Sequence, residues 1–83
     1  MLRSEALRYL RRMAQTARLL GEPPARARVF GRAALALRSW TAEDWARWTA
    51  GEAPRSEALD PRIERRLRRF VATGRARDLE ARL

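Results

Sequence analysis

The sequence predicts an all-α domain, a compact bundle of four to five short helices. Apolar residues recur every three or four positions along most of the chain, which is the spacing of one helix face. Glycine and proline divide this pattern into short segments, at residues 21–24, at Gly51 and at Gly74. No segment alternates apolar and polar residues with the period of a β-strand. We therefore expect residues 1–83 to form a single helical domain with a modest core.

The first helix is expected between Ser4, which can cap its N-terminus, and Gly21, which suits the position after its last turn. Pro23 and Pro24 prevent this helix from continuing. The residues expected to face the core are Ala6, Leu10, Met13, Ala17 and Leu20. Most arginines of this segment fall off that stripe, so we expect them in solvent.

The second helix is expected to begin near Pro24, because proline suits the first turn of a helix. Its buried face is predicted to carry Ala27, Phe30, Ala34 and Leu37. The many alanines of this segment favour the close approach of another helix. Arg28 and Arg32 are one turn apart and are expected to point in the same direction.

The third helix has the clearest start signal of the chain. Thr41 and Asp44 have the spacing of a capping box, in which each side chain binds the backbone of the other residue. Trp40 and Trp45 occupy the flanking positions of a hydrophobic staple, and Trp48 follows one turn later. Three tryptophans so close together favour a core cluster, and the alternative is a platform on which nucleic-acid bases stack.

The fourth helix is expected to begin after Asp60, an N-cap residue followed by proline, and to end at Thr73-Gly74. Its predicted buried residues are Ile63, Leu67, Phe70 and Val71. Its other faces carry Arg62, Arg65, Arg66, Arg68 and Arg69. A short helical turn is expected after Ser56. A last short helix is expected to present Ala76, Leu79 and Leu83 on one side.

Arginine supplies all 19 basic side chains, and the chain contains no lysine, histidine or cysteine. Arginine stays charged and presents a planar fork of donors that suits phosphate. The absence of histidine and cysteine excludes the usual zinc sites, catalytic triads and redox motifs, so we expect no metal, no cofactor and no enzymatic activity. A GC-rich or thermophilic coding preference is an alternative reason for arginine over lysine, but it does not explain the excess of basic residues.

The formal net charge of +9 is large for this length and favours a polyanionic partner, of which nucleic acid is the usual one. The charge balance is +7 over residues 1–38, −3 over residues 39–61 and +5 over residues 62–83. No apolar run approaches the roughly 18 residues that a membrane span needs. We therefore expect no membrane association and a cytoplasmic location.

Two stretches carry a family resemblance. Residues 20–34 read Leu-Gly-Glu-Pro-Pro-Ala-Arg-Ala-Arg-Val-Phe-Gly-Arg-Ala-Ala, and residues 70–80 read Phe-Val-Ala-Thr-Gly-Arg-Ala-Arg-Asp-Leu-Glu. In this order and at this separation they resemble the N-terminal domain of the family X DNA polymerases, the DNA polymerase beta family. The resemblance implies a SAM-like bundle of five short helices. It also implies DNA binding through a helix-hairpin-helix and a basic surface around a 5′ phosphate.

Some members of that family also remove deoxyribose phosphate through a lysine Schiff base. The resemblance aligns the nucleophilic lysine with Arg66. It aligns the supporting lysines with Arg26, Arg62 and Arg75. A guanidinium group offers no free amine to attack an aldehyde, so we expect this chain not to be a lyase. Weak catalysis through the α-amino group of Met1 or through a carboxylate is the residual alternative.

The family's glycine-rich hairpin turn aligns with residues 56–60, where Ala58 and Asp60 replace its two glycines. Those glycines let backbone N–H groups approach a phosphate at a helix N-terminus. Asp60 is expected to occupy that N-terminus with its own carboxylate, and Glu57 adds negative charge. These replacements weaken the hairpin contact with DNA that the resemblance implies, and its complete loss belongs to the alternative function given below.

These observations predict a non-catalytic nucleic-acid-binding domain that holds the phosphates of single-stranded or gapped DNA with little sequence preference. The candidate contacts are Arg26, Arg28, Arg32, Arg62, Arg65, Arg66, Arg69, Arg75 and Arg77. The alternative is that these arginines form a solvent-exposed charged face without a ligand, partly paired with Glu64, Asp78 and Glu80.

The alternative function is a protein–protein interaction module derived from the same fold. Its partner would be a separately encoded nucleotidyltransferase or repair protein, or a second copy of the chain. Exposure of any of the three tryptophans would favour this alternative. The expected oligomeric state is a monomer or a weak homodimer.

Overall fold

The computed structural model describes residues 2–52 and 59–74, which form four helices and no strand. The helices are α1 (Arg3–Leu19), α2 (Pro24–Ser39), α3 (Ala42–Thr49) and α4 (Pro61–Thr73). The predicted all-α class is therefore confirmed for this part of the chain. The expected turn after Ser56 and the expected last helix, with Ala76, Leu79 and Leu83, lie outside the described residues.

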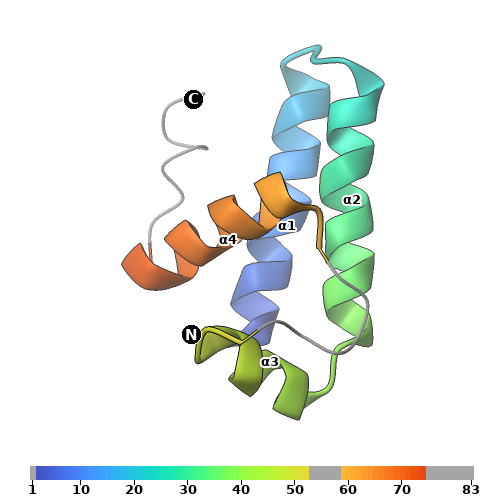
Figure 1. Cartoon of the computed structure of the whole chain (residues 1–83). Helices are drawn as coiled ribbons and strands as arrows, with labels where there is room; N and C mark the ends of the chain where they lie inside the picture. The colour runs from blue at the N-terminus through green and yellow to red at the C-terminus, as the bar shows by residue number, and fades with distance from the viewer. Residues whose placement is uncertain (1, 53–58, 75–83) are drawn as a thin grey trace.

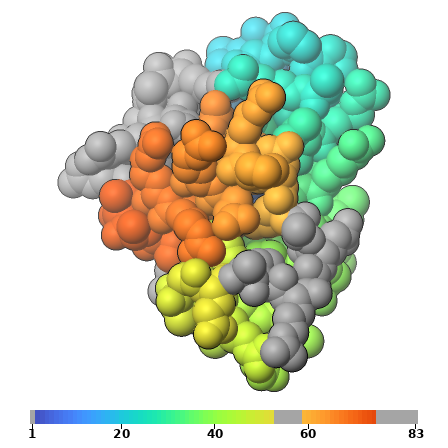
Figure 2. All heavy atoms as spheres, viewed as in Figure 1, coloured from blue at the N-terminus to red at the C-terminus, as the bar shows by residue number. Residues whose placement is uncertain are grey.

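The helices α1 and α2 form an antiparallel hairpin, which is the main scaffold of the domain (Figure 1). The short helix α3 lies across the end of the hairpin where α2 finishes, and α4 crosses the hairpin near its middle (Figure 1). The space-filling view from the same side shows the side chains of α4, in orange, lying over the hairpin (Figure 2). This crossing brings the start of α4 to the first half of α2, although α3 separates the two in the sequence.

The core lies where α4 and α3 meet the hairpin. Its largest fully buried side chains are Trp40, Trp48, Phe30, Leu10, Met13, Leu37 and Leu67. The predicted buried face of α2 is confirmed, because Ala27, Phe30, Ala34 and Leu37 are all buried. Trp45 is half-buried and stacks on Trp48, with the ring centroids 5.4 Å apart. The tryptophans therefore belong to the core cluster rather than to an open stacking platform.

The side chain of Tyr9 joins α1 to α4. Its ring stacks on that of Phe70 with the centroids 4.3 Å apart and the ring planes at 8°. Tyr9 lies outside the predicted stripe of α1 but is 4% exposed. The buried face of α1 is wider than predicted because this helix packs against both α2 and α4. Phe70 and Val71, which were predicted to be buried, are half-buried near the end of α4.

The start of α1 corrects the prediction that Ser4 is its N-cap. The N-cap is Leu2, which accepts hydrogen bonds from the backbone N–H groups of Glu5 and Ala6, and no side chain caps the helix. The guanidinium group of Arg3 donates a hydrogen bond to the backbone carbonyl of Trp40. This contact ties the first turn of α1 to the end of α2.

The end of α1 confirms the predicted glycine stop and corrects the predicted burial of Leu20. Gly21 follows the helix with φ 69°, and the N–H of Glu22 bonds to the carbonyl of Ala17, as the predicted glycine stop requires. Leu20, however, is 49% exposed although it was predicted to face the core. The helix has already ended at Leu19, and the tip of the hairpin extends beyond α4 (Figure 1).

The starts of α3 and α4 confirm the predicted caps. The N–H of Asp44 donates to Thr41 Oγ1 at 3.1 Å, and the N–H of Thr41 donates to Asp44 Oδ2 at 2.9 Å, which completes the capping box. Pro61 is the first residue of α4, and Asp60 Oδ1 accepts a hydrogen bond of 2.9 Å from the N–H of Arg62. These caps fix the position of α4 along the chain and so the direction of its arginines.

Candidate nucleic-acid interface

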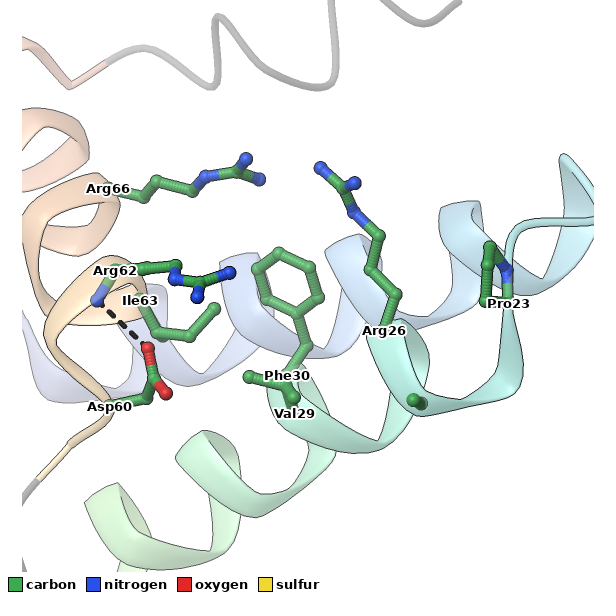
Figure 3. Close-up of a pocket in the computed structure, with 9 residues that line it drawn as sticks. Pro23, Arg26, Val29, Phe30, Asp60, Arg62, Ile63 and Arg66 are labelled. Atoms are coloured by element: carbon green, nitrogen blue, oxygen red, sulfur yellow. Dashed lines mark hydrogen bonds between the residues drawn. The ribbon is translucent and has the colours of Figure 1, made fainter.

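A cleft of about 450 Å³ opens between the start of α2 and the start of α4. Val29, Phe30 and Ile63 give it an apolar base. The guanidinium groups of Arg26, Arg62 and Arg66 extend into the space beside Phe30 (Figure 3). We call this feature the α2–α4 cleft.

Local structure places these three arginines. Because α2 begins at Pro24, Arg26 lies in its first turn, and the N–H of Arg26 bonds to the carbonyl of Pro23 at 2.9 Å. Because the Asp60 cap starts α4, Arg62 and Arg66 occupy its first two turns, four residues apart on the same side of the helix. The crossing of α4 over the hairpin then brings all three to one cleft.

The aromatic ring of Phe30 helps to position one of these cations. The Arg66 Cζ lies 5.8 Å from the centroid of the Phe30 ring, within the range of a cation–π contact. Phe30 is 1% exposed, so it forms a rigid base beneath the guanidinium group. Guanidinium groups stack on aromatic ring faces, so this contact holds Arg66 at the cleft.

Two carboxylates lie close to these arginines. The Arg26 Nε is 3.4 Å from Glu22 Oε2, and the Arg26 side chain remains 44% exposed. Asp60 lines the cleft, but its Oδ1 is engaged by the backbone N–H of Arg62. Among the described residues, three guanidinium groups therefore face two carboxylates, of which one caps a helix. The excess of positive charge favours an anionic ligand with several negative groups.

The other predicted contacts lie elsewhere. Arg65 and Arg69 are exposed on α4, and neither lines the cleft. Arg28 and Arg32 are exposed on α2 outside the cleft. The last two predicted contacts, Arg75 and Arg77, lie outside the described residues.

Arg68, which was expected on the faces of the fourth helix outside its buried stripe, has a structural role. Arg68 Nε lies 3.3 Å from Glu64 Oε1, and its Nη1 donates a hydrogen bond of 2.9 Å to the backbone carbonyl of Trp48. Its Cζ is 4.2 Å from the centroid of the Trp48 ring. The spacing of Glu64 and Arg68 signals the ion pair, whereas no pattern in the sequence signals the contact with Trp48.

The cleft is suited to holding an anion and poorly suited to acid–base chemistry. Its ionisable side chains, among the residues that the structure describes, are three arginines and Asp60, whose carboxylate is already used as a cap. A guanidinium group neither releases a proton readily nor attacks a carbonyl carbon. Within residues 2–52 and 59–74, no group of three or more histidine, cysteine, aspartate or glutamate residues gathers in one place.

The chain was compared with models of protein families, with curated proteins and with solved structures, and none of them matches it. Among the helices of the described segments, none is long and apolar enough to cross a lipid bilayer.

Proposed function

We propose that this chain is a non-catalytic nucleic-acid-binding domain that holds phosphate groups in the α2–α4 cleft. The observation that carries the proposal is the convergence of Arg26, Arg62 and Arg66 from two helices on one open cleft. The net charge of +9 adds a field that attracts a polyanion to the whole molecule. The resemblance to the N-terminal domain of the DNA polymerase beta family is consistent with this function and does not carry it.

The ligand is proposed to be DNA in single-stranded or gapped form, bound with little sequence preference. Guanidinium forks bind phosphate oxygens, which carry no sequence information directly. The apolar base of the cleft, made by Val29, Phe30 and Ile63, can contact a sugar beside the bound phosphate. A single strand presents its phosphates and sugars more flexibly than a duplex and so can follow a short cleft between two helices.

The burial of the tryptophans supports this function over a protein-interaction module. Exposed indole rings would have favoured a protein interface, but Trp40 is 2% exposed and Trp48 is 1% exposed. Trp45 is half-buried and packs against the core. The indole rings whose exposure would favour a protein interface are therefore mostly packed inside the domain. The arginine cleft carries the proposal.

A salt-titrated binding assay tests the proposal on labelled single-stranded, gapped and duplex DNA of equal length. For single strands, each phosphate contact contributes about −0.7 to the slope of log affinity against log salt, so three contacts give about −2. At low salt, the variant with Arg62→Gln and Arg66→Gln should lose at least tenfold in affinity at the cleft, with a slope for that site shallower by about 1.4.

A charge-matched control separates the cleft from the net charge. Arg12 is exposed on α1, and Arg47 forms an exposed ion pair with Glu43 at 2.7 Å. The variant with Arg12→Gln and Arg47→Gln has the same net charge as the cleft variant and should keep the wild-type affinity within about threefold. Absence of binding by the wild-type protein at about 50 mM salt, or equal losses in the two variants, would contradict the proposal.

A further inference from the structure

A second group of arginines lies along the seam between α1 and α2. It lines a groove of about 210 Å³ formed by Arg11 and Arg18 of α1 and by Gly31, Leu35 and Arg38 of α2. At 100° per residue, the α2 positions of this groove lie about 150° around the helix axis from those of the α2–α4 cleft. We call this feature the α1–α2 groove. It shares no lining residue with the cleft.

Among the described residues, no carboxylate offsets the positive charge of the α1–α2 groove. The part of the chain that the structure describes adds no aspartate or glutamate to its lining, and its three arginines are exposed. Within the described residues, no ion pair joins Arg11, Arg18 or Arg38 to a carboxylate. Like charges brought together on two packed helices repel one another, which opposes close packing of the hairpin. A bound anion would offset that repulsion.

Glycine at position 31 leaves the backbone of α2 uncovered at the groove. A glycine inside a helix is less favourable than alanine by about 1 kcal/mol. Gly31 lies in the interior of α2 and does not have a positive φ. A Cβ atom added there would meet no atom of the protein within 4 Å. Neither backbone conformation nor packing therefore requires glycine, and its effect is to keep the helix backbone open at the groove.

We propose that the α1–α2 groove is a second phosphate-binding surface, so that one copy of the chain holds two segments of nucleic-acid backbone. Arg11 and Arg18 are separated by about 10 Å along α1, given a rise of 1.5 Å per residue, and both face the groove. A sugar-phosphate strand that follows the seam meets their guanidinium groups on one side and that of Arg38 on the other. Leu35, which is 64% exposed, offers an apolar contact to a sugar or base.

This inference takes its ligand class from the proposed function but depends on different residues. With one binding surface on each side of α2, a single copy can hold two strands, or two points of one strand, at the same time. The cleft alone provides no such bridging. The number of oligonucleotides bound by one chain is therefore the quantity that distinguishes the two ideas.

The experiment is an isothermal titration with hexathymidylate at about 50 mM salt, where phosphate contacts are strong. The wild-type protein should bind two equivalents. Two variants, Arg11→Gln with Arg18→Gln and Arg62→Gln with Arg66→Gln, should each bind one. The charge-matched control, Arg12→Gln with Arg47→Gln, should bind two. Circular dichroism shows whether each variant keeps its helices.

A neutral substitution tests the groove without changing the charge. Because a Cβ at position 31 meets no protein atom, the Gly31→Leu side chain can extend into the groove without disturbing the core. This variant should fold at least as stably as the wild-type protein, since leucine favours helix more than glycine does. It should bind one equivalent, with at least a tenfold loss of affinity for the other.

Several outcomes would overturn the second site. The wild-type protein could bind one equivalent, and only the variant with Arg62→Gln and Arg66→Gln could lose it. In that case the groove is not a site and the proposed function stands. If the wild-type protein binds none, both ideas are wrong. Binding of two equivalents by the Gly31→Leu variant would also contradict a binding site in the groove. A concentration-dependent dimer in sedimentation that Leu35→Gln abolishes would show that a second copy covers the groove instead.

Discussion

The guanidinium group of Arg68 stands over the indole ring of Trp48, with Cζ 4.2 Å from the ring centroid. The same side chain donates a hydrogen bond of 2.9 Å to the backbone carbonyl of Trp48 and pairs with Glu64. It therefore fastens α4 to α3 by two interactions, the cation–π contact and the hydrogen bond, while the pair with Glu64 lies within α4. Arg68 is thus a structural residue, whereas Arg62 and Arg66, on the same helix, line an open cleft.

Replacing Arg68 should destabilise the domain more than replacing its neighbour Arg65. Arg68→Met removes the cation–π contact, the hydrogen bond and the ion pair, and should lower the free energy of unfolding by about 1–2 kcal/mol. Arg65 is exposed, and its side chain makes no hydrogen bond, ion pair or ring contact within the described residues. Arg65→Met should therefore change the free energy of unfolding by less than about 0.5 kcal/mol. Urea unfolding of both variants measures the difference. Equal stabilities would show that the contact with Trp48 contributes nothing.

Local signals in the sequence predicted the helices well. The Thr41–Asp44 capping box, the Asp60 cap and the positive φ at Gly21 and Gly74 depend on residues only a few positions apart. Each can therefore be read from a short stretch of chain. The exception is Ser4, because the N-cap of α1 is Leu2 and no side chain caps this helix. Helix ends are the least sharply specified parts of a helix.

The candidate site was predictable only in part. The spacing of Arg62 and Arg66 places them on one side of α4, which the sequence shows. Their convergence with Arg26 depends on the angle at which α4 crosses the hairpin, and no local pattern encodes that angle. For the same reason the sequence could not separate Arg68, which packs on Trp48, from Arg65 and Arg69, which are exposed.

The α1–α2 groove was missed for a related reason. Its arginines come from two helices, and periodicity along each helix shows only that they are off the buried stripe. The available signal was Gly31, a helix-disfavouring residue among good helix formers. The structure adds that a Cβ atom at position 31 would meet no neighbouring atom within 4 Å, so packing does not require glycine there.

Two arginines of α2 provide a matched test of the cleft. Arg26 lines it and Arg28 does not, although both are exposed and lie only two residues apart. Arg26→Gln should weaken binding to single-stranded DNA several-fold and make the salt slope shallower by about 0.7. Arg28→Gln should produce a smaller loss, because it removes the same charge from outside the cleft. Fluorescence anisotropy over a range of salt concentrations measures both effects. Larger losses for Arg28→Gln would place the phosphate site elsewhere on α2.

Gly31→Ala should stabilise the domain. The added Cβ meets no atom within 4 Å, and the residue keeps a helical backbone, so the gain in helix propensity of about 1 kcal/mol is not offset by strain. For a domain of this size, that gain raises the melting temperature by about 4–8 °C. Gly21→Ala is the opposite control, because Gly21 has φ 69° and alanine is strained there. Thermal denaturation should show changes of opposite sign, and a loss of stability in Gly31→Ala would reveal a hidden packing constraint.

Asp60→Asn should strengthen nucleic-acid binding with little effect on the fold. Asp60 both caps α4 and lines the cleft, so its carboxylate supports the helix and repels the proposed ligand. Asparagine caps helices about as well as aspartate, which should keep the free energy of unfolding within about 1 kcal/mol of the wild-type value. Removing a negative charge near a bound phosphate should raise the affinity several-fold, or about 1 kcal/mol at the effective dielectric of a protein surface.

The comparison with Asp60→Ala separates the two roles of this residue. Alanine also removes the charge, so it should raise the affinity of the folded protein, but it removes the cap and should cost about 1 kcal/mol of stability. Binding at about 50 mM salt and urea unfolding measure the two effects independently. If neither substitution raises the affinity, Asp60 does not face the bound phosphate. The anion would then have to lie nearer to Arg26 and Arg66, on the side of the cleft away from the start of α4.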